Sequence, residues 1–470
     1  MQKGTNRWAL QKPTKNVWQM LGPSLLLVAL AISGGELLLW PDLVSRYGFA
    51  FLWTVPLILI LQFAVNMEIE RYTAVTGETT LGGLVGLSKW FRLLFPISIV
   101  VSLVWPAWAS PAGNMLAHTF GVPGQGALFG MGIMLMLILI WNSKNSYKIL
   151  ETVARYGLLV VLGIILWVIG TNWDPQIMSE AANGFTSIGY FPPETDKFVL
   201  LSALAYGGVV GVLNLAQSDW TKAKGYAAAG REDPSLVNWE LEETQSSWKN
   251  WWSLMLKEHF VVYYIGNFVG IILLSILAFV TIRGLDVKNF AILTAQFDQL
   301  REQTPILGIA FGLGITLLFT MAQMTILDAQ GRLLKTSLQS KISNEKISQF
   351  VGVIGLIILL MTYINPDFNQ PAFLLRLSAS LSAGVMVMYA PFLLVLNNKL
   401  PEKTRPKLWN KLLVIGCAVF YGIIIVWSLL GSPKKLTKKW GAVVYSSSIH
   451  LRQRGFLLMY PTNLFSINGK

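Results

Sequence analysis

The stretch ALAISGGELLLWPDLV occupies residues 29–44, and its apolar run is interrupted by Ser33, Gly34, Gly35 and Glu36. A carboxylate in the middle of such a run is costly inside a bilayer unless it lines a cavity or finds a partner. The Gly-Gly pair favours unwinding, and unwound backbone exposes carbonyl groups that can bind a cation where they face a water-filled site. We therefore expect a membrane-spanning helix that is broken at its centre.

A second stretch, AYGGVVGVLNLAQSDW at residues 205–220, repeats this pattern with glycines at 207, 208 and 211. Glycines in membrane helices often only permit close packing of neighbouring helices. Two breaks at corresponding positions of two halves, however, are typical of a midplane site in secondary transporters. The pair of breaks therefore predicts a site between the first and sixth spans.

The composition places the whole chain in a membrane. It has 470 residues, of which 53% are hydrophobic and 13% charged, whereas soluble domains carry roughly 25% charged residues. Because a spanning helix needs about 20 mostly apolar residues, the sequence predicts an all-α integral membrane protein with about eleven spans. The expected spans lie at about 22–46, 49–67, 92–117, 125–141, 150–171, 197–217, 260–283, 305–328, 348–364, 371–396 and 409–430.

The net charge of +13 has two readings, basic cytoplasmic loops or a nucleic-acid surface. Eighteen Trp favour the first, because Trp concentrates at membrane interfaces, and we expect a lipid bilayer and no nucleic acid as partner. Basic residues in segment 1–18 and in the loops after the eighth and tenth spans place the N-terminus in the cytoplasm. We expect a bacterial-type plasma membrane. The basic tail 431–470 would lie outside and break this rule.

Two other segments lead to local expectations. The connection 219–258 contains NWELEETQSSWKNWW and suggests an amphipathic helix on the membrane surface. Cys417 is the only cysteine, which excludes an intrachain disulfide and a Cys-based metal site. A single thiol within an apolar helix is expected to serve packing.

Five short motifs follow one another along the chain: GPSLLLVA at 22–29, SRYGFAFLW at 45–53, RYTAVTGETTLGGL at 71–84, YKILETV at 147–153 and MAQMTI at 321–326. In their order and spacing, over about residues 17–430, they resemble the Nramp family of divalent-metal transporters. The resemblance implies a LeuT-type fold of two inverted five-helix repeats with broken helices 1 and 6. Repeat one would cover about 19–171, repeat two about 197–397 and an extra helix about 409–430, within a transporter domain 19–430.

The family's ligand motifs are altered in this chain. Its first-helix motif DPGN corresponds to residues 33–36, so Ser33 replaces an Asp ligand and Glu36 an Asn ligand. Its sixth-helix motif MPHN corresponds to residues 211–214, so Gly211 replaces the thioether ligand while Asn214 remains. The resemblance further implies two carbonyl ligands, at Leu30 and Gly208, and a site residue at Gln323 that competes with a plain interhelical hydrogen bond.

These ligands predict the kind of substrate. Without a thioether the donors are all oxygen, and Ser33, Glu36 and Asn214 suit a hard cation such as Mg²⁺ or Mn²⁺. We expect a secondary transporter with a divalent cation as its substrate, no resident cofactor, and a monomer as a plausible state. The family's proton-carrying histidines correspond to Leu213 and Ser218, so proton coupling is an open question. Five residues could relay protons, form a gate or lie at a wet boundary of the membrane: Ser218, Asp219, Glu151, Asp42 and Asp328.

Other classes remain as alternatives. No HExxH, GxSxG or Walker-type pattern occurs, so an enzyme is not expected. A channel would show charged rings or a filter repeat, and neither is evident. A transporter of a small organic amine or amino acid on the same fold is the main rival, in which Glu36 would hold an ammonium group. A relative that no longer transports is the last alternative.

Overall fold

The computed structural model describes residues 8–14, 16–103, 108–141, 146–285, 287–364 and 371–430. The chain divides into two compact units, Met1–Ile425 and Val426–Lys470, and the account below concerns the first. The predicted tail 431–470 and most of the basic residues of the N-terminal segment lie outside the described residues.

The described residues are helical almost throughout, with a single isolated bridge between Trp8 and Val237. The first half contains α1 (Val17–Met20), α2 (Pro23–Ala31), the π-helix η1 (Ile32–Leu39), α3 (Trp40–Tyr47), α4 (Thr54–Thr76), α5 (Thr80–Leu87), α6 (Phe91–Leu103), α7 (Ala109–Thr119), α8 (Gly126–Ile140), α9 (Ser146–Thr171) and α10 (Pro175–Thr186). The second half contains α11 (Lys197–Tyr206), α12 (Val212–Lys224), α13 (Glu242–Glu258), the π-helix η5 (His259–Tyr264), α14 (Ile265–Ile282), α15 (Ala291–Gln303), α16 (Pro305–Leu338), α17 (Asn344–Met361), α18 (Pro371–Asn398) and α19 (Leu408–Leu430).

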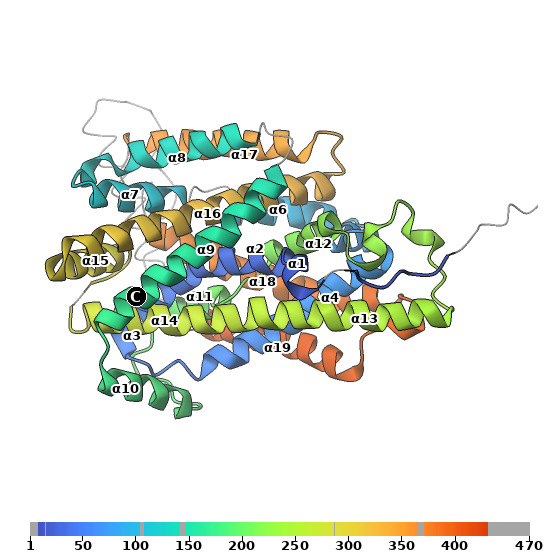
Figure 1. Ribbon diagram of the computed structural model, residues 1–470, viewed down its shortest axis with the longest axis horizontal. Helices are drawn as coiled ribbons and strands as arrows, with labels where there is room; N and C mark the ends of the chain where they lie inside the picture. Colours follow the sequence, from blue (N-terminus) through green and yellow to red (C-terminus); the bar gives the residue numbers. More distant parts are fainter. Residues whose placement is uncertain are drawn as a thin grey trace, which may run out of the picture. The chain divides into compact units, whose positions relative to one another are not determined.

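The predicted all-helical membrane fold is confirmed. Within the described residues, 8 helices are long and apolar enough to cross a membrane. The other three predicted spans correspond to α4, which carries charged residues in its last turns, to the pair α6 and α7, and to the interrupted pair α11 and α12. The bundle in Figure 1 is formed by these helices, with α8 and α17 side by side and α16 packed against α7 and α9.

Helix 1 differs from the expectation of an unwound break. The chain stays helical from Pro23 to Tyr47 as α2, η1 and α3, and its centre widens into a π-helix. A π-helix keeps each backbone N–H bonded to a carbonyl five residues earlier, as Trp40 N–H is to Gly35. In a fully buried segment this satisfies backbone groups that an unwound chain would leave unpaired. Below, the two ends of helix 1 are called the Ser24 end and the Asp42 end.

Helix 6 is broken as predicted. The helix α11 ends at Tyr206, residues 207–211 are not helical, and α12 begins at Val212. Gly211 has φ 79 and ψ -140, a conformation that is essentially restricted to glycine. The carbonyl of Leu204 that the break leaves open accepts a hydrogen bond from Tyr421 Oη at 2.8 Å. The glycines in this stretch therefore do produce a break.

The helix predicted in the connection 219–258 is α13 (Glu242–Glu258), which continues directly into a span, and its place on the membrane surface stays a prediction. α13, η5 and α14 form one continuous helix, Glu242–Ile282, of 41 residues, which runs as a straight rod in Figure 1. Two of its tryptophans contact neighbouring segments. Trp251 donates to the carbonyl of Gln11 at 2.9 Å, and the guanidinium of Arg71 lies 3.8 Å from the ring of Trp252.

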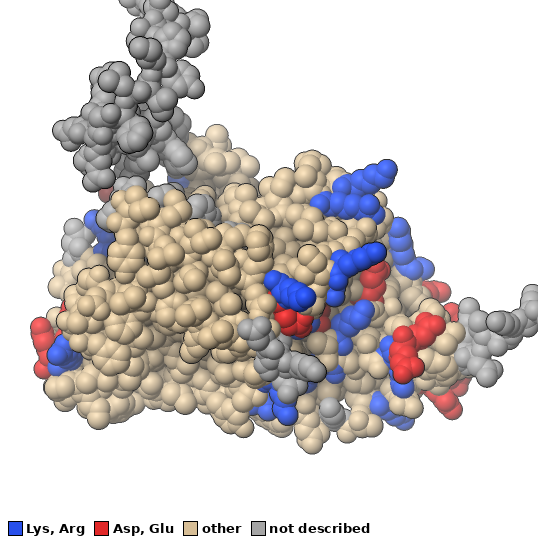
Figure 2. All heavy atoms as spheres, turned by 90° about the horizontal axis from the view of Figure 1, so that it is seen from above, with Lys and Arg blue, Asp and Glu red and all other residues tan. Residues whose placement is uncertain are grey.

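The surface agrees with a membrane environment. Figure 2 shows Lys, Arg, Asp and Glu side chains gathered toward one end, a smaller group at the other edge, and a broad uncharged band between them. Many large hydrophobic side chains are exposed on α8, α9, α17 and α19, for example Leu159 at 61% and Leu139 at 60%. Lipid tails would cover such a band at no cost, whereas soluble proteins rarely expose apolar patches of this extent.

Candidate functional site

A small cavity of about 10 Å³ lies between helix 1, the break in helix 6 and the start of α7. Its size corresponds to roughly one water molecule. The cavity is lined by Leu30, Trp108, Tyr206, Gly208, Val209 and Leu213. The two positions expected to offer backbone carbonyls, Leu30 and Gly208, therefore lie around the same cavity, although their predicted role as ligands stays a prediction.

Ser33 is bound to its own helix. Its hydroxyl is buried and donates to the carbonyls of Ala29 at 2.8 Å and Leu30 at 3.0 Å. This local bonding is common for serine inside helices and bends them. One carbonyl that was expected to face a cation, that of Leu30, thus accepts a hydrogen bond from the Ser33 hydroxyl in this structure.

Glu36 is the charged residue at the centre of helix 1, in η1. Its side chain is fully buried, and neither carboxylate oxygen has a hydrogen-bond partner among the residues that the structure describes. The carboxylate lies against Gly270 of α14, where a Cβ would collide with it. The absence of a side chain at Gly270 therefore makes the space for Glu36, which was not evident from the sequence.

Asn214 turns toward α4 and not toward Glu36. Its amide donates to Asn66 Oδ1 at 2.7 Å, and one turn later Gln217 donates to Glu70 Oε1 at 2.8 Å. Gly211 packs against Ser382 of α18. The three predicted metal ligands, Ser33, Glu36 and Asn214, thus each face a different neighbour in this conformation.

Gln323 makes the interhelical hydrogen bond that was the alternative to a site role. Its Oε1 accepts from the backbone N–H of Ala109, the first residue of α7, at 3.1 Å. A first-turn N–H has no partner within its own helix, so this bond satisfies a group that would otherwise be buried and unpaired. Its second predicted role, in the substrate site, stays a prediction.

The candidate proton-relay residues lie in different environments. Ser218 donates to the carbonyl of Leu215 at 2.6 Å, and Asp219 Oδ2 is buried with no hydrogen-bond partner in the described part of the chain. Glu151 is held by Arg155 and Lys224, each with 2.7 Å between the nitrogen and Oε1. Among Ser218, Asp219 and Glu151, only Asp219 has a buried side-chain oxygen with no hydrogen-bond partner in the part of the chain that the structure describes.

Buried ion pairs stand at both ends of helix 1. Asp42 contacts Arg46 at 2.8 Å and also Arg376 of α18. Toward the Ser24 end, Asp328 of α16 accepts from Arg332 Nε at 2.7 Å and from Trp220 Nε1 of α12 at 2.8 Å. Asp42 and Asp328 are 0% and 3% exposed, and the relay and wet-boundary roles considered for them stay predictions.

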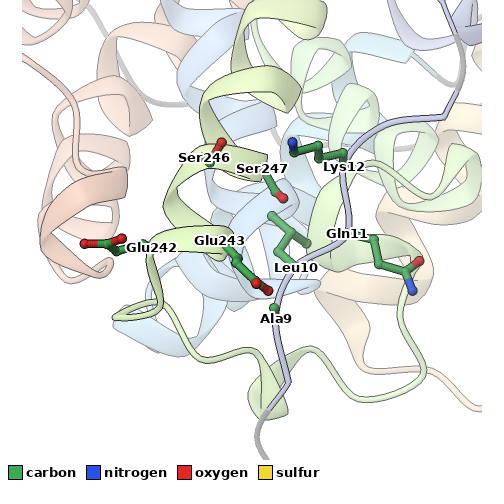
Figure 3. A pocket seen from close by; sticks show the side chains of 8 residues that line it. All are labelled: Ala9, Leu10, Gln11, Lys12, Glu242, Glu243, Ser246 and Ser247. Atoms are coloured by element: carbon green, nitrogen blue, oxygen red, sulfur yellow. The ribbon is translucent and has the colours of Figure 1, made fainter.

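A larger groove, of about 550 Å³, lies at the surface beside the N-terminal segment. Figure 3 shows its walls, residues 9–12 on one side and the first turns of α13, with Glu242 and Glu243, on the other. The N–H of Leu10 donates to Thr244 Oγ1 at 3.1 Å and fixes the segment there. This groove is separate from the cavity at helix 1, because the two share no lining residue.

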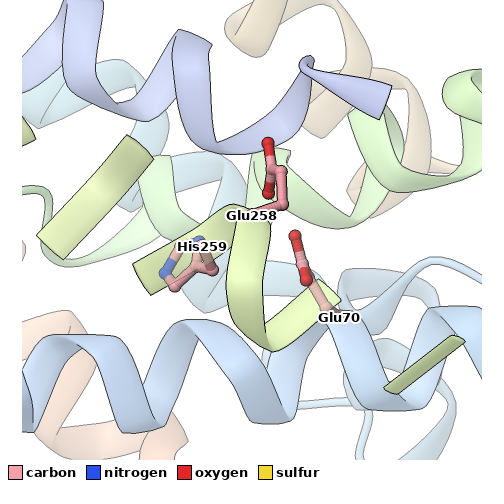
Figure 4. A group of neighbouring side chains, drawn as sticks. All are labelled: Glu70, Glu258 and His259. Atoms are coloured by element: carbon pink, nitrogen blue, oxygen red, sulfur yellow. The ribbon is translucent and has the colours of Figure 1, made fainter. Parts of the chain in front are cut away.

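Sequence reasoning missed a cluster formed by Glu70, Glu258 and His259 (Figure 4). The three side chains are fully buried, and their ligand atoms lie within 4.8 Å of one another. Glu258 is the last residue of the connection that was expected on the membrane surface, His259 lies between it and the seventh expected span, and Glu70 lies beyond the expected end of the second span. The only signal in the sequence was the presence of charged residues at the ends of two apolar runs.

Comparisons with known proteins agree with the helical arrangement. No family model matches the sequence, and no curated protein matches it. Among solved structures, the manganese transporter of Eremococcus coleocola, in complex with an aromatic bis-isothiourea substituted compound, is similar with a TM-score of 0.70 at 13% identity over 97% of each chain. A mutant of that transporter is similar with a TM-score of 0.69.

A second kind of transporter shows the same fold at lower similarity. It is a nucleobase-cation-symport-1 family transporter in a closed conformation with bromovinylhydantoin bound, with a TM-score of 0.55 at 10% identity over 92% of this chain and 96% of that chain. Identities this low establish the fold alone. The chain therefore has the LeuT-type fold, and the bounds of its two repeats stay a prediction.

Proposed function

We propose that the protein is a secondary transporter of a divalent metal cation, with alternating access about the cavity between helix 1 and the break in helix 6. The proposal rests first on Glu36, a carboxylate buried at the centre of helix 1 without a hydrogen-bond partner among the described residues. An uncompensated charge at this depth is expensive, and such residues mark ion or proton pathways. The likeness to a manganese transporter supports a metal substrate.

In the proposed cycle Glu36 supplies the negative charge of the site. Six further residues would complete the substrate site: Leu30, Ser33, Gly208, Gly211, Asn214 and Gln323. Since Ser33 and Asn214 have other hydrogen-bond partners in this structure, binding requires both side chains to give up these bonds and turn toward the cation. The hard oxygen donors favour Mg²⁺ or Mn²⁺.

The ion pairs at the two ends of helix 1 fit the role of gates. Asp42 and Arg376 join helix 1 to α18, whereas Asp328 and Trp220 join α16 to α12. Rocking of one repeat against the other would break the contacts at one end of helix 1 while the contacts at the opposite end stay formed. With the N-terminus cytoplasmic and the protein in a bacterial-type plasma membrane, the Ser24 end would be the inner one. Asp219 is the candidate for any coupled proton.

Replacing Glu36 by glutamine is expected to abolish saturable uptake of Mn²⁺ into proteoliposomes. The change keeps the shape and removes the charge, and loss of one partner of a buried charge pair corresponds to a fall in affinity on the order of 100-fold or more. Uptake is measured with a metal-sensitive dye inside the vesicles. Glu180→Gln is the matched control, because Glu180 is exposed and pairs weakly with Arg283 at 3.4 Å. Undiminished uptake by Glu36→Gln would contradict the proposal.

An organic cation is the second candidate, because two aromatic residues line the cavity. Trp108 and Tyr206 are buried there, and a quaternary or primary ammonium group binds well against such rings. Calorimetry distinguishes a metal cation from an organic cation as the substrate. Binding of an amine with no binding of Mn²⁺ or Mg²⁺ in calorimetry would favour the organic substrate, and Trp108→Leu should then weaken the amine.

A further inference from the structure

Glu70, Glu258 and His259 come together near the Ser24 end of helix 1 from two distant parts of the chain. Glu70 lies on α4, and the other two lie where α13 passes into η5. All three are fully buried, and one ligand atom of each lies within 4.8 Å of the other two. Figure 4 shows the carboxyl groups of Glu70 and Glu258 directed toward each other.

The hydrogen-bond partners of the cluster are neutral. The hydroxyl of Ser24 contacts Glu258 Oε2 and lies 2.7 Å from His259 Nδ1. The amide of Gln217 donates to Glu70 Oε1. Glu258 Oε1 and Glu70 Oε2 remain buried without a hydrogen-bond partner among the residues described.

A nearby cation does not remove this imbalance. Lys224 attracts Glu258, but its ammonium group donates to Glu151 at 2.7 Å. Two carboxyl groups that face each other in an apolar interior repel when both are charged, and each has lost its hydration. Buried carboxylates are normally paired or bound to a metal ion. A divalent cation between them would remove the repulsion and bind the two oxygens that have no partner.

We propose that Glu70, Glu258 and His259 form a binding site for a divalent transition-metal ion such as Mn²⁺ or Zn²⁺. Two carboxylates and one imidazole are the donors that these ions accept, whereas Mg²⁺ and Ca²⁺ prefer oxygen ligands throughout. Ser24 bridges Glu258 and His259, and Gln217 donates to Glu70, so these two side chains orient the ligands, as hydrogen-bonding groups do in metal sites.

The local backbone supports this assignment. His259 begins a π-helix, a widening of the helix that is rare and often found at functional sites. Its ring stacks on Tyr263 with centroids 4.6 Å apart and lies 5.0 Å from the ring of Phe63. The imidazole is thus held in one orientation beside the two carboxyl groups.

This site is separate from the proposed substrate site. Ser24 precedes Ser33 by about 13 Å along helix 1, at roughly 1.5 Å per residue. None of the three ligands lines the cavity at Leu30 and Gly208. The inference does not rest on the proposed transport function, because an ion can reside here whether or not the protein moves a substrate.

The decisive experiment is pulsed electron paramagnetic resonance on metal-stripped, full-length protein without a histidine tag, loaded with Mn²⁺. The chain has 3 histidines, so a His118→Gln, His450→Gln double variant leaves His259 as the only one. We expect that variant to bind Mn²⁺ and to show the nitrogen coupling of a directly bound imidazole. Excess Mg²⁺ should not displace the ion.

Substitutions within the cluster give the second readout. Glu258→Gln and His259→Gln should each lower the affinity for the nitrogen-coupled Mn²⁺ at least about tenfold, whereas Glu180→Gln, at an exposed side chain, should leave this affinity and the nitrogen coupling intact. Thermal unfolding of each variant establishes that it is folded. A folded Glu258→Gln that binds Mn²⁺ as the wild type does would overturn the proposal.

The metal-binding experiment can fail or succeed independently of the transport experiment. If the double variant binds no Mn²⁺, or binds it without nitrogen coupling, the cluster is not a metal site, even where Glu36 proves essential for uptake. If the coupling is present but Glu36→Gln transports normally, the metal site stands and the transport mechanism fails.

Discussion

Replacing Gly35 by alanine is expected to destabilise the protein by about 3 kcal/mol or more, because the site cannot hold even a methyl group. A Cβ at this position would collide with the backbone carbonyl of Tyr206, the last residue of α11. A side-chain tip can move aside at little cost, but this carbonyl is held by a helix end. Helix 1 would have to move away from α11, and thermal unfolding in detergent should show a lower midpoint.

The neighbouring glycine provides the control for this prediction. A Cβ at Gly34 would lie 3.3 Å from Trp108 Nε1 and 3.7 Å or more from its other neighbours, so small adjustments suffice. Alanine also favours the helix by about 1 kcal/mol over glycine. Gly34→Ala should therefore unfold within a few degrees of the wild type. Equal midpoints for the two variants would mean that η1 and α11 do not pack as closely as the structure has them.

Replacing Asp328 by alanine is expected to open the Ser24 end of the bundle. The change leaves Arg332, 13% exposed in its side chain, without its carboxylate and leaves the buried N–H of Trp220 without its acceptor. Removing one partner of a buried pair costs about 3 to 5 kcal/mol. Part of that cost is recovered when α12 separates from α16 and water reaches Arg332. The equilibrium should thus shift toward a state that is open at this end.

Cysteine labelling measures this shift. The native chain offers only Cys417, which is buried, so a cysteine introduced at Leu213 in the cavity wall is a clean reporter. In the Asp328→Ala background this cysteine should react with a maleimide faster on the order of 100-fold, which corresponds to a shift of the closed-to-open equilibrium by about 3 kcal/mol.

The control for labelling is an exposed ion pair. Arg283→Ala removes the pair between Arg283 and Glu180, whose atoms are 3.4 Å apart and well exposed. Such surface pairs contribute about 0 to 1 kcal/mol, so the labelling rate of the reporter should not change. Slow labelling in Asp328→Ala as well would show that the contact of Asp328 with α12 does not close this end.

The sequence predicted the positions of the spans more reliably than whether each span is a continuous or a broken helix. Long apolar runs predict spans because lipid demands them locally, residue by residue. The same reasoning treated the glycines at 34–35 and 207–211 alike, yet the first pair lies in a π-helix and the second group in a real break. The difference comes from neighbours: Gln62 and Tyr421 satisfy the opened end of α11, and these residues are far away in the chain.

The candidate site was predictable only in part. Leu30 and Gly208 do line one cavity, as the two corresponding breaks suggested, and Glu36 is buried. Its pocket against Gly270 and the turn of Asn214 toward Asn66 depend on packing between helices, for which a single sequence carries no signal. The cluster at Glu70 was invisible for the same reason, because Glu70 is 188 positions away from Glu258 in sequence and lies on a different helix.

By itself the sequence determined that this chain is a multi-span membrane protein, that its sixth span is interrupted by glycines, and that an acidic residue lies at the centre of the first. These properties follow from hydropathy and backbone freedom, which act over a few consecutive residues. Only the tertiary structure decided that the first span remains helical, which carbonyls and amides face the cavity, and that two carboxyl groups and an imidazole meet near the Ser24 end. Those outcomes depend on the close packing of helices that lie far apart in sequence, where the room for one methyl group decides what fits.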